Sequence, residues 1–165
     1  MAKEVKEYLV GSVSLTDNKA SLEITGRIEE TIDGDKNYCD PVFLITINPY
    51  AGKFVSMKLN NIEMRATVQN FLLYYYGKIK EFQRQSGGRN SQCFLKTYKR
   101  STYDYIGLIR GENSVEISFK EHELLGLVKE LENLCDALSD ALFKTQQMIA
   151  RKKAKKQKKK EQENG

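Results

Sequence analysis

The residues best suited to chemistry in this chain are aromatic and cationic side chains between residues 93 and 110. In residues 93–100 they occupy every second position, and a strand places every second side chain on one face. The next predicted strand offers Tyr103 and Tyr105 on one face. Aromatic rings stack on unpaired bases at roughly 1–3 kcal/mol per base, while cations hold the phosphates. The candidate nucleic-acid-binding residues are Phe94, Lys96, Tyr98, Lys99, Arg100, Tyr103, Tyr105 and Arg110.

The first half of the chain carries a thinner version of the same mixture in Lys53, Phe54 and Lys58. Because a duplex buries the faces of its bases, a sheet surface of this kind suits single strands. The alternative is that the rings are buried between the layers of a two-sheet domain. The sequence alone leaves both interpretations open.

The C-terminus concentrates the positive charge of the chain. Residues 151–165 contain eight basic and two acidic side chains, and the remaining residues contain 19 basic and 20 acidic ones. Such a block of like charge predicts a disordered basic tail that attracts polyanions. A solubilising terminus, an unstructured continuation of the last helix, a nuclear address and an anionic membrane surface are the alternatives. The binding candidates in the tail are Arg151, Lys152, Lys153, Lys155 and Lys156.

Residues typical of catalysis or of a metal site are sparse. His122 is the one histidine, and no cysteine or carboxylate pair lies near it at ligand spacing. The chain has no G-x-S-x-G motif, phosphate-binding loop or dinucleotide fingerprint. We therefore expect a protein that is not an enzyme and that takes no cofactor, metal or small-molecule substrate. Cys39, Cys93 and Cys135 are an odd set, which predicts reduced thiols.

An internal repeat predicts the elements that position these residues. Residues 43–82 align without a gap on residues 103–142, at an offset of 60, and most matched pairs keep hydrophobic character and phase rather than identity. We expect an α+β domain of duplicated antiparallel sheet-plus-helix units in the order ββββα-βββα. Residues 1–150 would form one pseudo-twofold domain with halves at about 8–84 and 92–150, followed by the tail at 151–165.

Hydrophobic periodicity supplies the boundaries of these elements. Residues 29–40 are polar and predict a loop, and residues 85–91 predict a linker. Asn60 and Glu63, like Ser118 and Glu121, have capping-box spacing. The predicted strands are 8–15, 20–27, 42–48, 53–59, 93–99, 103–110 and 114–119, and the predicted helices are about 60–82 and 120–150.

The last helix carries an unbroken heptad seam from residue 124 to residue 149. About 30 residues span roughly 45 Å, which exceeds the roughly 20 Å of a six-residue strand. The C-terminal half of the seam therefore predicts a homo-oligomer, a dimer or a tetramer. The alternative is that the first helix of the same chain covers it. The predicted oligomerisation residues are Leu131, Cys135, Leu138, Leu142 and Ile149.

The element order, the duplication and the segment Val115-Glu-Ile-Ser-Phe119 leading into a capped helix resemble the Whirly proteins and the coactivators of the positive-cofactor-four type. The Pur family is similar in layout. The Lys-Gly-Lys-Ala-Ala-Leu signature of Whirly proteins is absent. The resemblance, which covers roughly residues 8–145, implies binding of single-stranded DNA or RNA along sheet surfaces and assembly through helices.

The sequence therefore predicts a non-catalytic protein that binds single-stranded nucleic acid, with DNA favoured over RNA. The alternative is a scaffold protein that recruits partners through its helix and uses the tail for solubility or targeting. No apolar run approaches 18 residues and no signal peptide is visible, so we expect no membrane contact. A cytoplasmic protein is expected, with a nucleoid-associated, nuclear or organellar location as variants.

Overall fold

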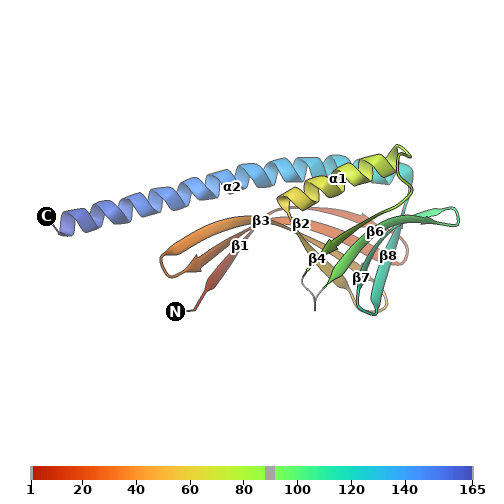
Figure 1. Cartoon of the computed structure of the whole chain (residues 1–165), viewed down its shortest axis with the longest axis horizontal. Helices are drawn as coiled ribbons and strands as arrows, with labels where there is room; N and C mark the ends of the chain where they lie inside the picture. Colours follow the sequence, from red (N-terminus) through yellow and green to blue (C-terminus); the bar gives the residue numbers. More distant parts are fainter. Residues whose placement is uncertain (1, 88–91, 165) are drawn as a thin grey trace.

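The protein is built from two four-stranded antiparallel sheets, each followed by an α-helix (Figure 1). The computed structural model describes residues 2–87 and 92–164. The first sheet contains β1 (Glu4–Thr16), β2 (Ala20–Asp33), β3 (Lys36–Pro49) and β4 (Val55–Asn60), and α1 (Asn61–Tyr75) follows it. The second sheet contains β5 (Phe82–Ser86), β6 (Cys93–Arg100), β7 (Tyr103–Arg110) and β8 (Asn113–Phe119), and α2 (Glu121–Glu163) follows it. This arrangement confirms the α+β class with duplicated sheet units.

The offset of 60 residues brings β4 and α1 onto β8 and the first part of α2. Strands β3 and β7 differ by one residue, because Ile45 pairs with Met57 whereas Ile106, rather than Tyr105, pairs with Ile117. The helix starts keep the same offset. Asn60 forms the predicted capping box with Glu63, and the backbone N–H of Lys120 donates to the Glu123 carboxylate at 2.9 Å. The predicted second box at Ser118 was wrong, because Ser118 still belongs to β8.

The predicted loop at residues 29–40 forms strand, whereas the predicted linker at residues 85–91 overlaps β5 only at Gln85 and Ser86, and its residues 88–91 lie outside the described part of the chain. Residues 29–40 complete a long β2–β3 hairpin, which turns at Gly34 with a φ of 63°. The second unit has four strands rather than three, because β5 pairs with β6 along Phe82–Ser86. Helix α1 ends at Tyr75 rather than near residue 82, since the chain reverses at Gly77 with a φ of 71°. The second unit therefore starts about ten residues earlier than predicted.

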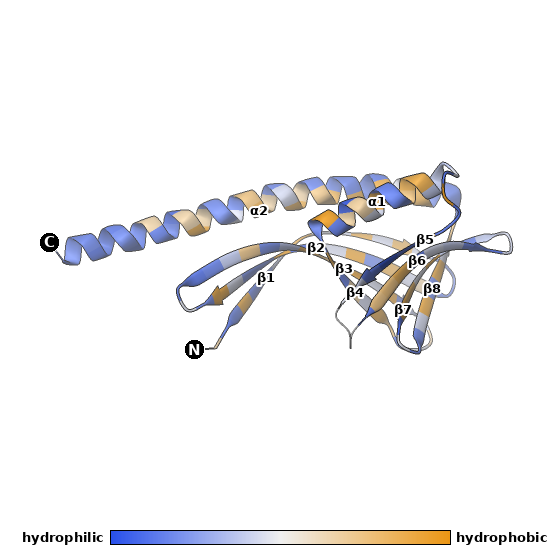
Figure 2. Cartoon of the chain, viewed as in Figure 1, coloured by the Kyte–Doolittle hydropathy of each residue, from blue (hydrophilic) through white to orange (hydrophobic). Residues whose placement is uncertain are grey.

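A single hydrophobic core joins both sheets and both helices. In the second sheet, β6 buries Cys93 and Leu95 on its inner face, while the opposite face remains partly exposed. Helix α2 lies along the first sheet (Figures 1 and 2), and its side chain Leu134 fits against paired glycines in β1 and β2. A Cβ atom built on Gly11 or Gly26 would lie only 3.0 or 3.1 Å from the Leu134 Cδ1 atom. The bare backbone at these two positions lets α2 approach the sheet closely.

The heptad seam of α2 belongs mainly to the core of its own chain. Leu131, Cys135 and Leu138 are buried against the rest of the molecule, so the prediction that they contact another subunit was wrong. The reason is the length of the first sheet, whose strands of 13 or 14 residues span roughly 45 Å rather than the expected 20 Å. Leu142 and Ile149, farther along the seam, are partly exposed.

Asp17, in the turn between β1 and β2, links the two sheets. Its Oδ2 atom accepts hydrogen bonds from the backbone N–H and the hydroxyl of Ser118, both at 2.9 Å. Its Oδ1 atom accepts from the N–H groups of Lys19 and Ala20. Burial acts to raise the pKa of the Asp17 carboxyl, but these hydrogen bonds outweigh burial, and the pKa is lowered.

We expect Asp17→Asn to lower the free energy of unfolding by about 1–3 kcal/mol at neutral pH. The amide can still accept from the turn, but its NH2 group cannot accept from Ser118. Because the folded pKa is depressed, the wild-type carboxylate stabilises the fold above its unfolded pKa of about 4 and loses this contribution as the pH falls towards the folded value. Urea unfolding at neutral and acidic pH measures both effects. Asp33→Asn, at the exposed hairpin tip, is the control, and equal stability of the two variants would contradict the role of Asp17.

Candidate nucleic-acid interface

The outer face of the second sheet gathers most of the predicted aromatic and cationic residues. Strands β6 and β7 pair Tyr98 with Tyr105 and Arg100 with Tyr103, so these side chains share a face. The structure thus confirms the predicted phase of both strands. We call this surface the aromatic–cationic face, and it consists of Phe94, Lys96, Tyr98, Arg100, Tyr103 and Tyr105.

Tyr98 lies across the sheet rather than standing away from it. Its hydroxyl donates to the Glu116 carboxylate on β8, two strands away, which is roughly 10 Å in a sheet. The ring passes Gly107 of β7, where a Cβ atom would lie 3.6 Å from the tyrosine. A side chain at position 107 would therefore lie in contact with the ring. The ring of Tyr105 is nearly parallel to that of Tyr98, at 21°, with a centroid distance of 5.8 Å.

A carboxylate occupies the centre of this face. Glu116 accepts from Tyr98 and from the Arg100 guanidinium, whose Nη2 atom lies 2.5 Å from Oε1. Burial, and then the hydrogen bond to Glu116, raises the pKa of Tyr98 to about 12, so its hydroxyl is protonated at neutral pH. The Arg100 guanidinium also lies over the ring of Tyr105, 4.5 Å from its centroid. In the unbound protein, the Glu116 carboxylate thus pairs with the charge of Arg100. The Arg100 guanidinium covers the ring of Tyr105, on which a base could otherwise stack.

Other exposed groups on this face have fewer internal contacts. Tyr103 is 63% exposed, whereas Phe94 and Lys96 are partly exposed. These three side chains surround the Tyr98–Tyr105 pair with one further cation and two further rings. The face therefore offers aromatic area and positive charge on a surface that residues 2–87 and 92–164 leave partly exposed.

Several predicted residues lie elsewhere. Arg110 lies on the opposite face of β7 and donates to the backbone carbonyl of Ser56 at 2.6 Å, which links the sheets. Lys58 lies on the outer face of the first sheet, 3.3 Å from Glu29. Lys53 and Phe54 lie in the exposed connection between β3 and β4. The predicted site is therefore not one continuous surface.

The basic residues of the C-terminus extend helix α2 instead of forming the predicted disordered tail. The helix continues to Glu163, and its last part is mostly hydrophilic (Figure 2). Lys, Gln, Glu and Ala have high helix propensity, and the preceding helix supplies the nucleus, which outweighs the repulsion between like charges. Figure 1 shows the basic part of α2 alongside the β2–β3 hairpin. The pKa of Glu30 on β2 is lowered, first by the hydrogen bond from Tyr8 and to a smaller extent by the charge of Lys152. In Figure 1 the basic part of α2 lies at the opposite end of the molecule from the second sheet.

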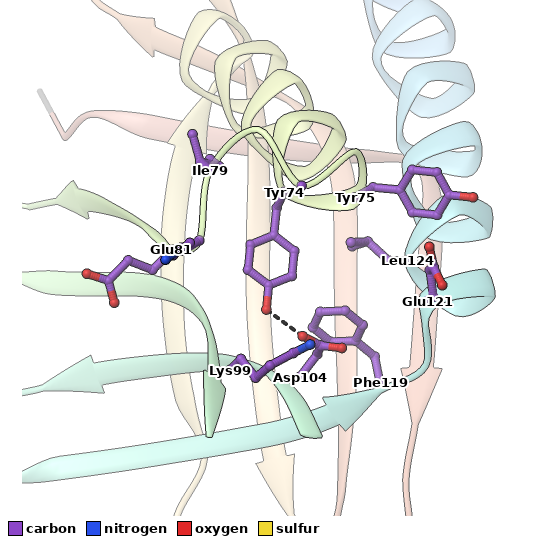
Figure 3. Close-up of a pocket in the computed structure, with 11 residues that line it drawn as sticks. Tyr74, Tyr75, Ile79, Glu81, Lys99, Asp104, Phe119, Glu121 and Leu124 are labelled. Carbon is purple, nitrogen blue, oxygen red and sulfur yellow. Dashed lines mark hydrogen bonds between the residues drawn. The ribbon is translucent and has the colours of Figure 1, made fainter. Parts of the chain in front are cut away.

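A pocket of about 680 Å³ lies on the inner side of the second sheet, where α1 ends and α2 begins (Figure 3). Tyr74 reaches down from α1 and donates to the Asp104 Oδ1 atom on β7 at 2.5 Å. Phe119 and Tyr75 line the same pocket, and the Lys99 side chain lies beside Asp104. Sequence periodicity did not single out Tyr74 or Asp104, because the pocket joins elements 30 residues apart.

The described residues show little else that could form a site. Within residues 2–87 and 92–164, no group of three or more His, Cys, Asp or Glu side chains could hold a metal ion. No helix in that part of the chain is long and apolar enough to cross a membrane. Cys39, Cys93 and Cys135 are free thiols, and burial raises the pKa of each.

Comparison with known proteins finds no protein-family model that matches the chain and no curated protein with significant sequence similarity to it. The functional interpretation therefore depends on the geometry and chemistry of the side chains described above.

Proposed function

We propose that the protein binds single-stranded nucleic acid, without catalysis, on the aromatic–cationic face of the second sheet. The observation that carries this proposal is the near-parallel pair of Tyr98 and Tyr105, with Lys96 and Arg100 around them on a sheet face that the described residues leave partly exposed. Rings that lie along a surface present a π-face to a base, and nearby cations hold the phosphates. The layout of two sheet-plus-helix units, on which the resemblance to Whirly proteins depends, is consistent with this use.

Single strands fit this face better than duplexes. A duplex stacks its bases on one another, so their faces are not available to tyrosine rings. The base-specific groups of a duplex would have to be read in a groove by a helix or a two-stranded ribbon. DNA is favoured over RNA, in keeping with the expectation from sequence.

Fluorescence anisotropy with labelled oligo-dT and the matching duplex, at roughly 50 and 200 mM salt, tests the proposal directly. We expect the single strand to bind more tightly. Combining Tyr98→Ala with Tyr103→Ala should weaken binding by roughly 30-fold or more, since each stacked ring contributes about 1–3 kcal/mol. Tyr76→Ala, directly after the end of α1, is the matched control, because Tyr76 is 65% exposed but lies outside the aromatic–cationic face. Equal loss in the control, or equal affinity for both nucleic acids, would overturn the proposal.

Glu116 should compete with the phosphates of the strand for Arg100. We expect Glu116→Gln to raise the affinity for a short single strand by about two- to fivefold, because it frees the guanidinium and removes a repelling charge. The amide oxygen can still accept from Tyr98, which keeps the ring flat. Glu112→Gln changes the net charge equally, but Glu112 lies in the exposed turn before β8. Unchanged or weaker binding by Glu116→Gln, relative to Glu112→Gln, would show that Arg100 does not hold a phosphate.

A second candidate function is helix-mediated association, either of two or four copies of the chain or with another protein. The observation that favours it is the exposure of Phe143 and Met148 on α2, at 61% and 56%, beyond the most buried part of the seam. Light scattering coupled to size-exclusion chromatography measures the self-association. Binding of oligo-dT by a monomer would leave the two functions independent.

A further inference from the structure

The pocket of Figure 3 adjoins the aromatic–cationic face through an open edge of β6. Strand β5 pairs with β6 only as far as the pair Phe82–Thr97, so among the described residues β6 has no strand partner on that side beyond Thr97. A second hollow of about 570 Å³ lies at this edge and includes Lys96 and Tyr98 of the aromatic–cationic face. The two hollows share Lys99 and Glu81. A single-stranded nucleic acid bound on the outer face can therefore turn around the edge of β6 and place one nucleotide in the pocket.

The walls of the pocket suit a flat, uncharged ring. Tyr74 and Phe119 meet edge to face with centroids 6.2 Å apart, and Leu124 and Ile79 supply further apolar surface (Figure 3). Among the lining residues, three carboxylates outnumber two lysines, so the pocket as a whole does not attract a phosphate. The occupant expected from this lining is a base whose phosphates remain outside.

The polar groups of the pocket stand in a fixed arrangement. Asp104 and Lys99 are direct neighbours across β7 and β6, on the inner face of the sheet. Opposite residues of paired strands hold their Cβ atoms about 5 Å apart, so a carboxylate and an ammonium group can contact one edge of the same ring. The hydroxyl of Tyr74 donates to Asp104 Oδ1 and holds the carboxylate in place, while Oδ2 and the second lone pair of Oδ1 remain to accept from a ligand. Burial raises the pKa of Tyr74, and the hydrogen bond to Asp104 raises it further, so Tyr74 remains a donor at neutral pH.

We propose that this pocket binds one unstacked guanine of the bound strand, with Asp104 accepting from its N1–H and N2–H groups and Lys99 donating to its O6 atom. This inference rests on the proposed function and adds a base preference to it. Guanine presents two adjacent donors beside an acceptor, which matches a carboxylate beside an ammonium group. Adenine and cytosine place a ring-nitrogen acceptor beside their amine, and thymine flanks its single N–H group with two carbonyls; both arrangements would repel the carboxylate.

The test uses oligo-dT of about 15 nucleotides whose central base is thymine, guanine or hypoxanthine, which lacks the 2-amino group. We expect guanine to tighten binding by roughly tenfold or more over thymine, as bidentate base contacts do, and hypoxanthine to give an intermediate gain. Asp104→Asn should abolish the preference but keep the affinity for oligo-dT. Because Asp104 also binds Tyr74, Lys99→Met provides a second variant at an exposed position and should lose part of the preference. Asp35→Asn, at the exposed hairpin tip, is the control.

The outcomes distinguish this inference from the proposed function. Equal affinity for the three strands, with oligo-dT still bound, would overturn the guanine pocket and leave the aromatic–cationic face intact. If none of the oligonucleotides binds, the proposed function fails. Titration with guanosine and with thymidine, followed by backbone amide chemical shifts, then tests separately whether the pocket binds guanine. Shifts at Asp104, Phe119 and Leu124 with guanosine but not with thymidine would support it, and their absence would overturn it.

Discussion

Deleting residues 151–165 is expected to weaken binding of a long single strand about 100-fold at roughly 50 mM salt, and much less at 200 mM. The basic residues of this segment point around the whole circumference of α2, so about half of the eight can contact one strand at a time. Each phosphate contact releases counterions and contributes about −0.7 to the slope of log affinity against log salt for single strands. The deletion should therefore reduce the slope by about 3.

A matched variant separates charge from length. Replacing the eight basic residues with glutamine keeps good helix formers and the full chain, and should reproduce the deletion. The described part of this segment, up to Asn164, is exposed, so the unfolding transition should hardly move. Unchanged affinity and slope in both variants would remove the basic end of α2 from the binding mechanism. A loss in the deletion alone would assign the effect to the helix rather than to its charge.

Leu138→Asp should unfold the protein or lower its free energy of unfolding by more than about 4 kcal/mol, because it buries an unpaired charge. Leu138 has no exposed surface and packs in the core shared by the sheets and helices. The sequence had assigned this residue to an interface between subunits, where the same change would separate subunits and leave each folded. Circular dichroism and urea unfolding measure stability, and size-exclusion chromatography measures assembly.

Phe143→Asp is the control for this prediction, since Phe143 lies five residues farther along α2 and is 61% exposed. It should change the free energy of unfolding by less than about 0.5 kcal/mol. A folded Leu138→Asp monomer derived from a wild-type dimer would contradict the buried position of Leu138. Loss of self-association in Phe143→Asp alone would support the second candidate function.

The repeat in the sequence predicted β4, β8 and the two helix starts because it records hydrophobic phase, which places Met57 and Ile117 on the inner faces that the structure buries. The repeat is out of phase by one residue between β3 and β7, since Ile45 lies in the core but Tyr105, at the same offset, lies on the outer face. Hydrophobic phase alone did not predict the element correctly where the same residues fit both the helical and the strand period. Phe82 continues the stripe of α1 but also begins the alternation of β5, and only the reversal at Gly77 decides between them. The hairpin of β2 and β3 was missed because its distal half is polar on both faces, so hydrophobicity does not mark it as strand.

The sequence predicted which side chains of one β-strand share a face, but not which side chains of different strands contact each other. Alternation identified the face that carries Tyr98 and Arg100, and the register confirms it. The contact of both residues with Glu116 depends on the pairing of three strands, which no local pattern specifies. The pocket at Tyr74 and Asp104 depends in addition on the angle at which α1 lies over the second sheet.

The placement of the two basic regions at opposite ends of the molecule has a kinetic consequence. Helix α2 alone is roughly 65 Å long, so a strand held by its basic end and by the second sheet would be gripped at two separate places (Figure 1). When one site is bound, the effective concentration of the same nucleic-acid strand at the other site is high, which slows complete dissociation in the absence of competing strands. The nucleic acid can nevertheless dissociate from one contact site while it stays bound at the other, and a competing nucleic-acid strand can then bind the free site. A protein bound in this way would pass directly from one strand to another, at a rate that rises with the concentration of the acceptor strand.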